Sequence, residues 1–309
     1  MGTGTSHALV AAVSEAGGFG ILGVTNLTKD ALSAEVEKIR AATERPFGLN
    51  HLLFQVREDR FQAMLDLRPK LISTAWAWPD QDLRPLFERA HDVGARVMHM
   101  VSTVPEAERA AAAGADIIVA QGTEGGGHVG WMASMPLVPM VVRAVAPLPV
   151  VEAGGVADGA GLAAALALGA EGVLLGTRFL ATPEAPVPPR FKQTILDSDG
   201  HDTLLTEIPD IASGTVWPGA MSRVRRNAFV ERWAGREWQL RQLQHEVGPQ
   251  VAAARRNDQV DDYTIGTGQT AGLIHELKPA GQIVQEIVVE AESIIAERLQ
   301  SLVATAARA

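Results

Sequence analysis

Two short glycine-containing segments carry the residue types that bind phosphate. Gly154-Gly155 and Gly176-Thr177 each follow a strand-like apolar run. Glycine lets a backbone approach a ligand closely, and the N–H groups at the start of the following helix attract anions. One such turn alone would indicate only a tight connection between a strand and a helix. Two turns after successive strands predict a phosphate clamp of backbone amides and the Thr177 hydroxyl.

A third glycine-rich segment, Gln121–Gly130, contains a histidine. His128 follows three consecutive glycines, just beyond the strand-like run Asp116–Ala120. Histidine side chains gain and lose protons near neutral pH, so a histidine beside a ligand site is a candidate base. A histidine that only anchors the loop is the alternative interpretation.

Other polar residues end strand-like runs or stand in the loops behind them. Gln121 and Asn50 can each donate and accept hydrogen bonds, either to a ligand or to cap a strand end. Glu124 either orients His128 or caps its loop. No cluster of His, Asp and Glu has the spacing of a metal site.

Alternating strand and helix patterns must position these residues. Apolar runs predict seven strands: Gly20–Val24, Phe47–Leu53, Leu71–Ala75, Arg96–Val101, Asp116–Ala120, Val150–Ala153 and Gly172–Leu175. Helical spacing predicts Ser6–Ala16, Ala31–Thr43, Asp82–Val93, Pro105–Ala113, Pro136–Val145 and Gly159–Leu168 between them. Gly94, Gly114 and Gly169 stand where helices should end. Near-continuous apolar strands separated by helices predict a parallel sheet.

The number of strands leaves two architectures open. A closed (β/α)8 barrel, the TIM-type fold, has eight strands, and seven βα units are visible. The chain opens on a glycine-rich turn and a helix, which would normally follow a first strand. We therefore expect an α/β barrel whose first strand is largely absent. An open doubly wound sheet is the alternative.

The pattern changes after Thr182. Residues 183–189 are proline-rich and predict a rigid linker. We expect residues 1–189 to form the barrel, 190–262 a smaller, mainly helical lid that includes a helix over Phe229–Val247, and 263–309 a return to the barrel. The amphipathic helix Pro279–Arg308 should pack against it.

Composition excludes several classes of protein. The net charge of −9 and the pI near 5.4 argue against nucleic-acid binding. The absence of cysteine excludes disulfides, thiolate metal sites and a cysteine nucleophile. No apolar run is long enough to span a bilayer, and the first residues lack the pattern of a signal peptide, so we expect a cytoplasmic protein without a membrane partner.

Several aromatic and sulfur-containing residues also follow strand ends. Trp76, Trp78, Trp131 and Met132 either wall an apolar substrate pocket or pack under the lid. His99, between two methionines, is expected to be a hydrogen-bonded core histidine in the barrel interior. A basic cluster in the lid, Arg223 to Arg226, is expected to be a solvated face, with binding of an acidic substrate tail as the alternative.

Together these segments resemble a known family. The segments are Pro46–Asn50, Gln121–His128, Glu152–Gly159, Gly176–Thr182 and Gly268–Ile274, in this order. They are similar to the signatures of the nitronate monooxygenases, formerly called 2-nitropropane dioxygenases. The FMN-dependent enoyl-ACP reductases of the FabK type share much of this set.

The resemblance implies a TIM barrel with non-covalent FMN at the carboxyl ends of its strands and a helical insertion over the flavin. It implies His128 as the catalytic base. It also implies the cofactor-binding residues Asn50, Gln121, Gly127, Gly154, Gly155, Gly176, Thr177 and Gln269. The implied partners are a small nitronate or nitroalkane and O2, with no nucleic acid. A homodimer is compatible with the pattern.

Two features depart from the family. Relatives usually carry a small residue where Glu152 stands, and a carboxylate there would repel a phosphate unless it points away or pairs, with Arg178 as a candidate partner. We expect Glu152 to be structural. The missing first strand normally ends in a turn against the flavin ring, and Met1 and Gly2 resemble a remnant of it.

Three functions follow from these patterns. The first is an FMN-dependent nitronate monooxygenase that forms a carbonyl compound and nitrite without a nicotinamide. The second is an NAD(P)H-dependent FMN enoyl-ACP reductase or a related flavin reductase, for which no separate dinucleotide fingerprint is visible. The third is a flavin-free interaction protein.

Overall fold

The computed structural model describes residues 4–306 and contains a curled parallel sheet of seven strands. The strands are β1 (Gly20–Gly23), β2 (Phe47–Leu52), β3 (Leu71–Ala75), β4 (Arg96–Val101), β5 (Ile117–Gln121), β7 (Val150–Ala153) and β8 (Gly172–Leu174). Their order in the sheet is their order in the chain. A doubly wound sheet reverses its order at a switch point, so the sheet is of the TIM-like kind and the doubly wound alternative is wrong.

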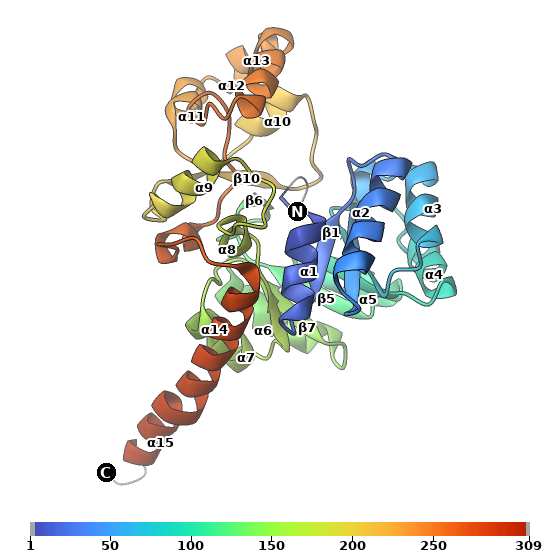
Figure 1. The fold of residues 1–309 in the computed structure, drawn as a ribbon, viewed down its shortest axis with the longest axis vertical. Coiled ribbons are helices and arrows are strands. Elements are labelled where there is room, and N and C mark those ends of the chain that lie inside the picture. The colour runs from blue at the N-terminus through green and yellow to red at the C-terminus, as the bar shows by residue number, and fades with distance from the viewer. Residues whose placement is uncertain (1–3, 307–309) are drawn as a thin grey trace.

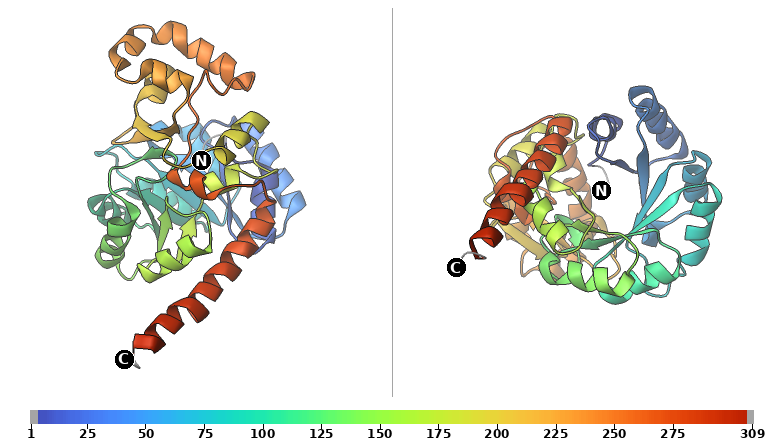
Figure 2. Two further views of the ribbon diagram at one scale, coloured as in Figure 1. Left: turned by 90° about the vertical axis from the view of Figure 1, so that its left-hand side faces the viewer. Right: turned by 90° about the horizontal axis from the view of Figure 1, so that it is seen from below.

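The sheet curls into an incomplete ring, which Figure 2 shows from below. Among the described residues, β1 pairs only with β2 and β8 pairs only with β7, so these two strands are the edges. The amide of Gly23 on the β1 edge donates to the Thr5 hydroxyl at 2.8 Å. Met1 and Gly2, the expected remnant of a turn, lie outside the described residues.

Helices cover the outside of the ring (Figure 1). They are α1 (His7–Glu15), α2 (Lys29–Ala42), α3 (Glu58–Asp66), α4 (Arg84–Asp92), α5 (Val104–Ala112), α6 (Ser134–Val145) and α7 (Gly159–Ala167), with the short 3-10 turn η1 (Leu53–Gln55) after β2. Hydroxyl or carboxylate caps fix several of their starts, as Asp158 does by accepting from the Gly161 amide. Gly94, Gly114 and Gly169 follow helix ends with positive φ, which confirms their predicted role.

Apolar side chains pack on both faces of the sheet, and this explains the continuous apolar strands. On β4, Val97 belongs to the large core between the sheet and the helices, whereas Met98 belongs to a smaller cluster inside the ring. His99 does not point into the ring. Its ring lies 5.7 Å from that of Phe87 on α4, and its Nδ1 lies 2.7 Å from the Thr74 hydroxyl. The core histidine is confirmed, but on the helix side of the sheet.

The buried position of His99 predicts a loss of stability in mild acid. Burial lowers the pKa of His99 to about 3, and the charge of Arg109 adds to the effect. Below pH 6.5, the usual pKa of histidine, His99 binds a proton in the unfolded chain but not in the folded chain. The free energy of unfolding is therefore unaffected above pH 6.5 and falls toward pH 3, with a contribution of about 2 kcal/mol lost at pH 5.

Urea unfolding of the His99→Gln variant at pH 8 and pH 5 tests this. Glutamine can still bond to Thr74 but does not titrate, so the drop in unfolding free energy between the two pH values should shrink by about 2 kcal/mol relative to the parent chain. An equal drop in both proteins would show that His99 is not the group responsible.

Residues 189–262, hereafter the 189–262 segment, form a second core beyond the carboxyl ends of the strands (Figures 1 and 2). Its elements are α9 (Pro189–Leu196), β9 (Thr203–Thr206), α10 (Ile208–Ser213), β10 (Met221–Arg225), α11 (Ala228–Trp233), α12 (Glu237–Gln242) and α13 (Gln244–Arg256). The helix expected over Phe229–Val247 is divided among α11, α12 and α13, because Gly235 adopts a positive φ between the first two.

A small antiparallel sheet links this segment to the barrel, and the sequence analysis missed it. Its central strand β10 pairs with β9 on one side and with β6 (Gly127–Val129), from the loop after β5, on the other. His128 on β6 stands opposite Ser222 on β10. The loop that carries the histidine is therefore a strand of the second sheet.

The C-terminal helical stretch agrees only in part with its prediction. After the short α8 (Thr177–Leu180) and the 3-10 turn η2 (Gln269–Leu273), the helix α14 (Ala280–Ser293) buries Ile283, Ile287 and Ala291 and lies beside α7 and α1. It continues as η3 (Ile294–Leu299) and α15 (Gln300–Ala306), which project from the body of the molecule (Figure 1). Within this projecting part, η3 still lies beside the barrel helix α7, although none of its residues is fully buried. Within residues 4–306 no helix has the length and apolar character needed to cross a membrane.

Candidate active site

The predicted site residues lie at the edge of the sheet where its parallel strands end. Gln121 is the last residue of β5, as expected, whereas Asn50 lies within β2, two residues before the strand ends at Leu52. Gln121 pairs in register with Ala153, which directly precedes Gly154. Gly176 and Thr177 follow β8. In α/β folds ligands bind at this end of the strands, so the arrangement agrees with a ligand site.

Three loop segments come together at this edge. The amide of Gly122 donates to the Ala153 carbonyl at 2.8 Å, and the amide of Gln269 donates to the Glu124 carbonyl at 3.0 Å. A Cβ at Gly126 would lie 2.4 Å from the Gly268 nitrogen, so the two backbones are in direct contact. The predicted motif around Gln269 therefore belongs to the same site as the glycine-histidine loop.

The residues of the predicted phosphate clamp have unusual backbone conformations and, in part, open space beside them. Gly154 and Gly155 adopt φ values of +88° and +76°, a region that side-chain-bearing residues rarely occupy. A Cβ on Gly176 would meet nothing within 4 Å, so there is open space beside this glycine. The Thr177 hydroxyl accepts from the Gly268 amide at 3.0 Å, which leaves its own proton available to a further acceptor.

The side-chain amides of Gln121 and Asn50 differ in how many hydrogen bonds they make to the rest of the protein. The Oε1 atom of Gln121 is buried and has no hydrogen-bond partner among the described residues. A buried amide oxygen without a partner is costly, so it marks a place where a ligand can donate. The Asn50 amide nitrogen already donates to the Ser73 hydroxyl at 3.0 Å and, more weakly, to its carbonyl. The Asn50 side chain is therefore bonded to the middle of the neighbouring strand β3 and caps no strand end.

His128 is held by two residues that the sequence analysis missed. Its Nε2 lies 2.7 Å from Oδ1 of Asp210, and its ring stacks on that of Trp217 with centroids 3.4 Å apart and planes 8° from parallel. Both partners come from the 189–262 segment. The His128 side chain is 16% exposed and that of Asp210 is 12% exposed. No local motif marks either partner, because Asp210 is 82 residues away in the chain.

Glu124 does not orient His128. Its carboxylate accepts from the amide and the hydroxyl of Ser134, at 3.1 and 3.0 Å, at the beginning of α6. Of the two roles considered for Glu124, the structure selects capping, because a carboxylate is stabilised by the unpaired amides at a helix start.

Glu152 is buried beside the same helix start. It is 4% exposed, and strand alternation places it on the helix-facing side of β7 rather than inside the ring. Burial raises the pKa of the Glu152 carboxyl, a hydrogen bond from Ser134 opposes this, and the charge of Glu124 adds to it. Arg178 is not its partner, because its guanidinium donates to the carbonyls of Glu276 and Ala181 instead.

Aromatic rings surround the histidine on its barrel side. Trp217 also contacts Phe54 and Trp76, with ring centroids 4.6 and 6.1 Å apart, and Phe54 contacts Trp78 edge-on at 6.2 Å. Trp76 has a φ of +57°, a strained value for a large side chain, directly after β3. Trp76 and Trp78 therefore belong to one group of packed aromatic rings, hereafter the aromatic wall, and contact with a substrate stays a prediction. Trp131 is 69% exposed.

The arginines of the basic cluster of the 189–262 segment are all paired, but they differ in exposure, from the buried Arg223 to the exposed Arg226. Arg223 is buried, and its Nε donates to the Thr123 carbonyl at 2.8 Å, which ties β10 to the glycine-histidine loop. Arg225 pairs with Asp202 and Arg226 with Glu231. The expectation of a solvated face is thus wrong for Arg223.

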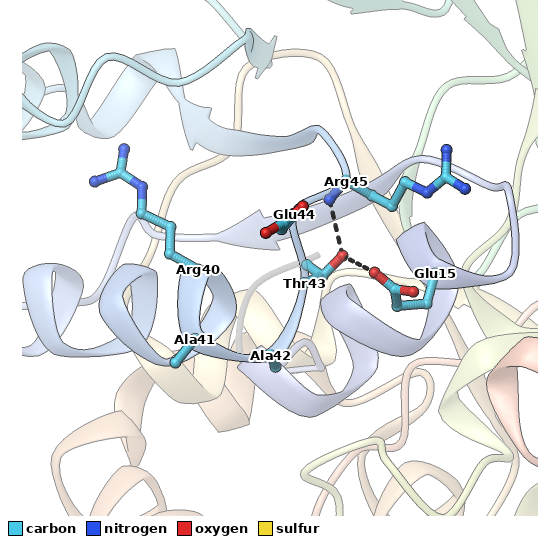
Figure 3. A pocket seen from close by; sticks show the side chains of 7 residues that line it. All are labelled: Glu15, Arg40, Ala41, Ala42, Thr43, Glu44 and Arg45. Carbon is cyan, nitrogen blue, oxygen red and sulfur yellow. Dashed lines mark hydrogen bonds between the residues drawn. The ribbon is translucent and has the colours of Figure 1, made fainter.

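A separate hollow of about 690 Å³ lies at the opposite end of the barrel, between the ends of α1 and α2 (Figure 3). Glu15 accepts there from the Thr43 hydroxyl. The guanidinium groups of Arg40 and Arg45 point away from each other, so they do not converge on a common ligand. This hollow has no part in the site at the strand ends.

Comparisons with known proteins agree with this geometry. Residues 1–63 and 56–290 match the protein family described as nitronate monooxygenase. A nitronate monooxygenase of Neurospora crassa is 32% identical, with 97% of this chain and 88% of the relative covered. The (3aS,4S,5R,7aS)-5-hydroxy-7a-methyl-1-oxo-octahydro-1H-indene-4-carboxyl-CoA dehydrogenase of Mycobacterium tuberculosis is 34% identical over 94% of this chain and 91% of the relative. The solved structure of FabK from Thermotoga maritima superimposes with a TM-score of 0.86 at 32% identity, covering 98% of this chain and 93% of the other.

Proposed function

We propose that this chain, which belongs to the nitronate monooxygenase family, oxidises alkyl nitronates with O2 to a carbonyl compound and nitrite. As a member of this family the chain is an oxidoreductase of the flavin-dependent type. The observation that carries the proposal is the position of His128. It is bonded to a buried carboxylate and lies in the loop that contacts the Gly154 turn.

FMN is the proposed cofactor, and the residues at the strand ends suit it. Gly154, Gly155, Gly176 and Thr177 would hold its phosphate through backbone amides and a hydroxyl. Gln121, with its unpartnered buried oxygen, would accept from the flavin ring or the ribityl chain, and Asn50, Gly127 and Gln269 complete the proposed set. When bound, FMN supplies the redox chemistry of the reaction.

The chain's own residues supply position and proton transfer. His128 is proposed to remove a proton from the carbon next to a nitro group, so that a neutral nitroalkane can enter the reaction as a nitronate. The wall of Phe54, Trp76 and Trp217 would exclude water from this side and bind the apolar part of the substrate.

The 189–262 segment is proposed to be a lid over this site. It lies beyond the carboxyl ends of the strands (Figure 1), and it holds the glycine-histidine loop through β10 and Arg223. We accordingly retain residues 1–189, 190–262 and 263–309 as the proposed barrel, lid and return to the barrel.

Nitrite release tests the proposed reaction. Protein supplied with FMN is incubated in air with propionate 3-nitronate and without NAD(P)H. Catalytic nitrite formation is expected, since a nitronate needs no further deprotonation. Absence of nitrite from protein that is visibly yellow would contradict the monooxygenase and favour the second candidate.

The second candidate is an NAD(P)H-dependent flavin reductase acting on a larger acyl substrate. Two relatives favour it: the superimposed FabK and the dehydrogenase named for a bicyclic carboxyl-CoA substrate. The extended aromatic wall agrees with an apolar substrate of that size. Rapid bleaching of the flavin by NADH without any nitronate would support this candidate over the first.

A further inference from the structure

We propose that Asp210 and Trp217 are positioning residues that hold His128 as a base, so that the base is complete only when the 189–262 segment is docked. The inference rests on the proposed function for the identity of the substrate. The geometry that supports the inference is independent of the proposed function, because the contacts of Asp210 and Trp217 with His128 are present in the structure itself.

Asp210 is fixed by the second core. It lies in the first turn of α10, and its neighbours Ile208, Ile211 and Ala212 are buried in that core. Its carbonyl accepts from the Thr215 amide at 3.0 Å. The carboxylate is therefore presented to His128 from a backbone that has little freedom to move.

Trp217 fixes the plane of the imidazole. The stacking contact covers one face of the His128 ring, and the same indole contacts Phe54 and Trp76 from the barrel. The indole is thus packed between the histidine and two strand ends. Because β6 pairs with β10, the backbone of His128 is held by the same segment.

The hydrogen bond to Asp210 selects one tautomer of His128. A carboxylate accepts only, so in the neutral ring Nε2 carries the proton and donates it. Nδ1 then has a free lone pair, and no hydrogen bond among residues 4–306 involves this atom. Nδ1 can take the proton from the carbon next to the nitro group, and the electron pair of the broken C–H bond stays on the nitronate. The resulting imidazolium remains beside the Asp210 carboxylate, which stabilises it.

The experiment compares two substrates in the FMN-loaded enzyme. Nitroethane must lose a proton before oxidation, whereas ethylnitronate has already lost it. For Asp210→Asn, the ratio of kcat/KM for nitroethane to kcat/KM for ethylnitronate should fall about tenfold or more, because an amide no longer imposes one tautomer. Glu207→Gln, which removes a neighbouring carboxylate paired with Arg241, is the matched control and should leave the ratio unchanged.

Trp217 is tested by a conservative and a truncating variant. Trp217→Phe keeps a ring beneath the imidazole and should retain most of the ratio, whereas Trp217→Ala should lower it. An equal loss on both substrates in Asp210→Asn or Trp217→Ala would overturn the inference, because a structural role does not distinguish them. An unchanged ratio in Asp210→Asn would overturn it as well.

A spectroscopic readout separates this inference from the proposed reaction. Nitrogen-15 NMR of labelled protein should show His128 as the Nε2–H tautomer in the parent chain and as a mixture in Asp210→Asn. The Nδ1–H tautomer in the parent would overturn the inference even if nitrite is formed. If no nitrite is formed but the tautomer is as expected, the proposed reaction fails and the role of Asp210 stands.

Discussion

Replacing His128 by alanine should lower kcat/KM for neutral nitroalkanes by roughly 10²- to 10⁴-fold relative to that for preformed nitronates. The imidazole is the group proposed to take the substrate proton, and alanine leaves nothing in its place. The effect should be specific, because the glycines proposed to hold the phosphate follow other strands, β7 and β8. Nitrite release from nitroethane and ethylnitronate, with flavin content measured by absorbance, provides the test.

The control for His128→Ala is His245→Ala on α13. His245 is exposed and, among residues 4–306, pairs only with its neighbour Glu246, so its loss should change neither rate. If His128→Ala lowers turnover of both substrates equally, His128 orients the substrate and does not transfer its proton. Unchanged turnover of nitroethane would remove His128 from the mechanism altogether.

Gly126→Ala should destabilise the protein and weaken its retention of FMN. The added Cβ would lie 2.4 and 2.6 Å from the backbone atoms of Gly268 and Thr267, distances that the structure can relieve only by moving one loop. Overpacking of this kind costs about 1–3 kcal/mol. Urea unfolding measures the loss of stability, and gel filtration of the FMN-loaded variant measures how much flavin stays bound.

Gly172→Ala is the matched control for this substitution. Gly172 lies on β8, and a Cβ there would meet nothing within 4 Å. Its effect on unfolding should stay within about 0.5 kcal/mol, as for other substitutions without a steric conflict. Equal effects at the two positions would mean that close contact of the two loops is not what makes glycine necessary at Gly126.

The sequence was informative where local rules decide the structure. Strands such as Leu71–Ala75 and Arg96–Val101 were placed at their observed bounds, because residues buried on both faces leave a continuous apolar run. Helix ends were recognisable from Gly94, Gly114 and Gly169, since few other residues accept that backbone conformation. The gathering of the glycine turns at one edge follows from a parallel sheet alone.

The rest depended on contacts that no local pattern encodes. Asp210 and Trp217 meet His128 only because β10 pairs with β6, and short strands like β6 have no recognisable periodicity. Glu124 stands close to His128 in sequence, yet its carboxylate accepts hydrogen bonds from the amide and the hydroxyl of Ser134 at the start of α6. The side of the sheet on which His99 lies follows from strand alternation, because Val97 on the same face of β4 packs in the core between the sheet and the helices.

The separate core of the 189–262 segment has a consequence for how such enzymes diverge. Asp210 is anchored among Ile208, Ile211 and Ala212, whereas the glycines proposed to hold the cofactor are anchored on the barrel strands. Substitutions in the smaller core can therefore change how Asp210 positions His128 without moving the glycines proposed to hold the cofactor. Proteins as differently named as a nitronate monooxygenase and an octahydroindene-carboxyl-CoA dehydrogenase align with this chain over nearly its whole length. If substitutions accumulate in the smaller core while the barrel stays the same, relatives can align over their whole length and still catalyse different reactions.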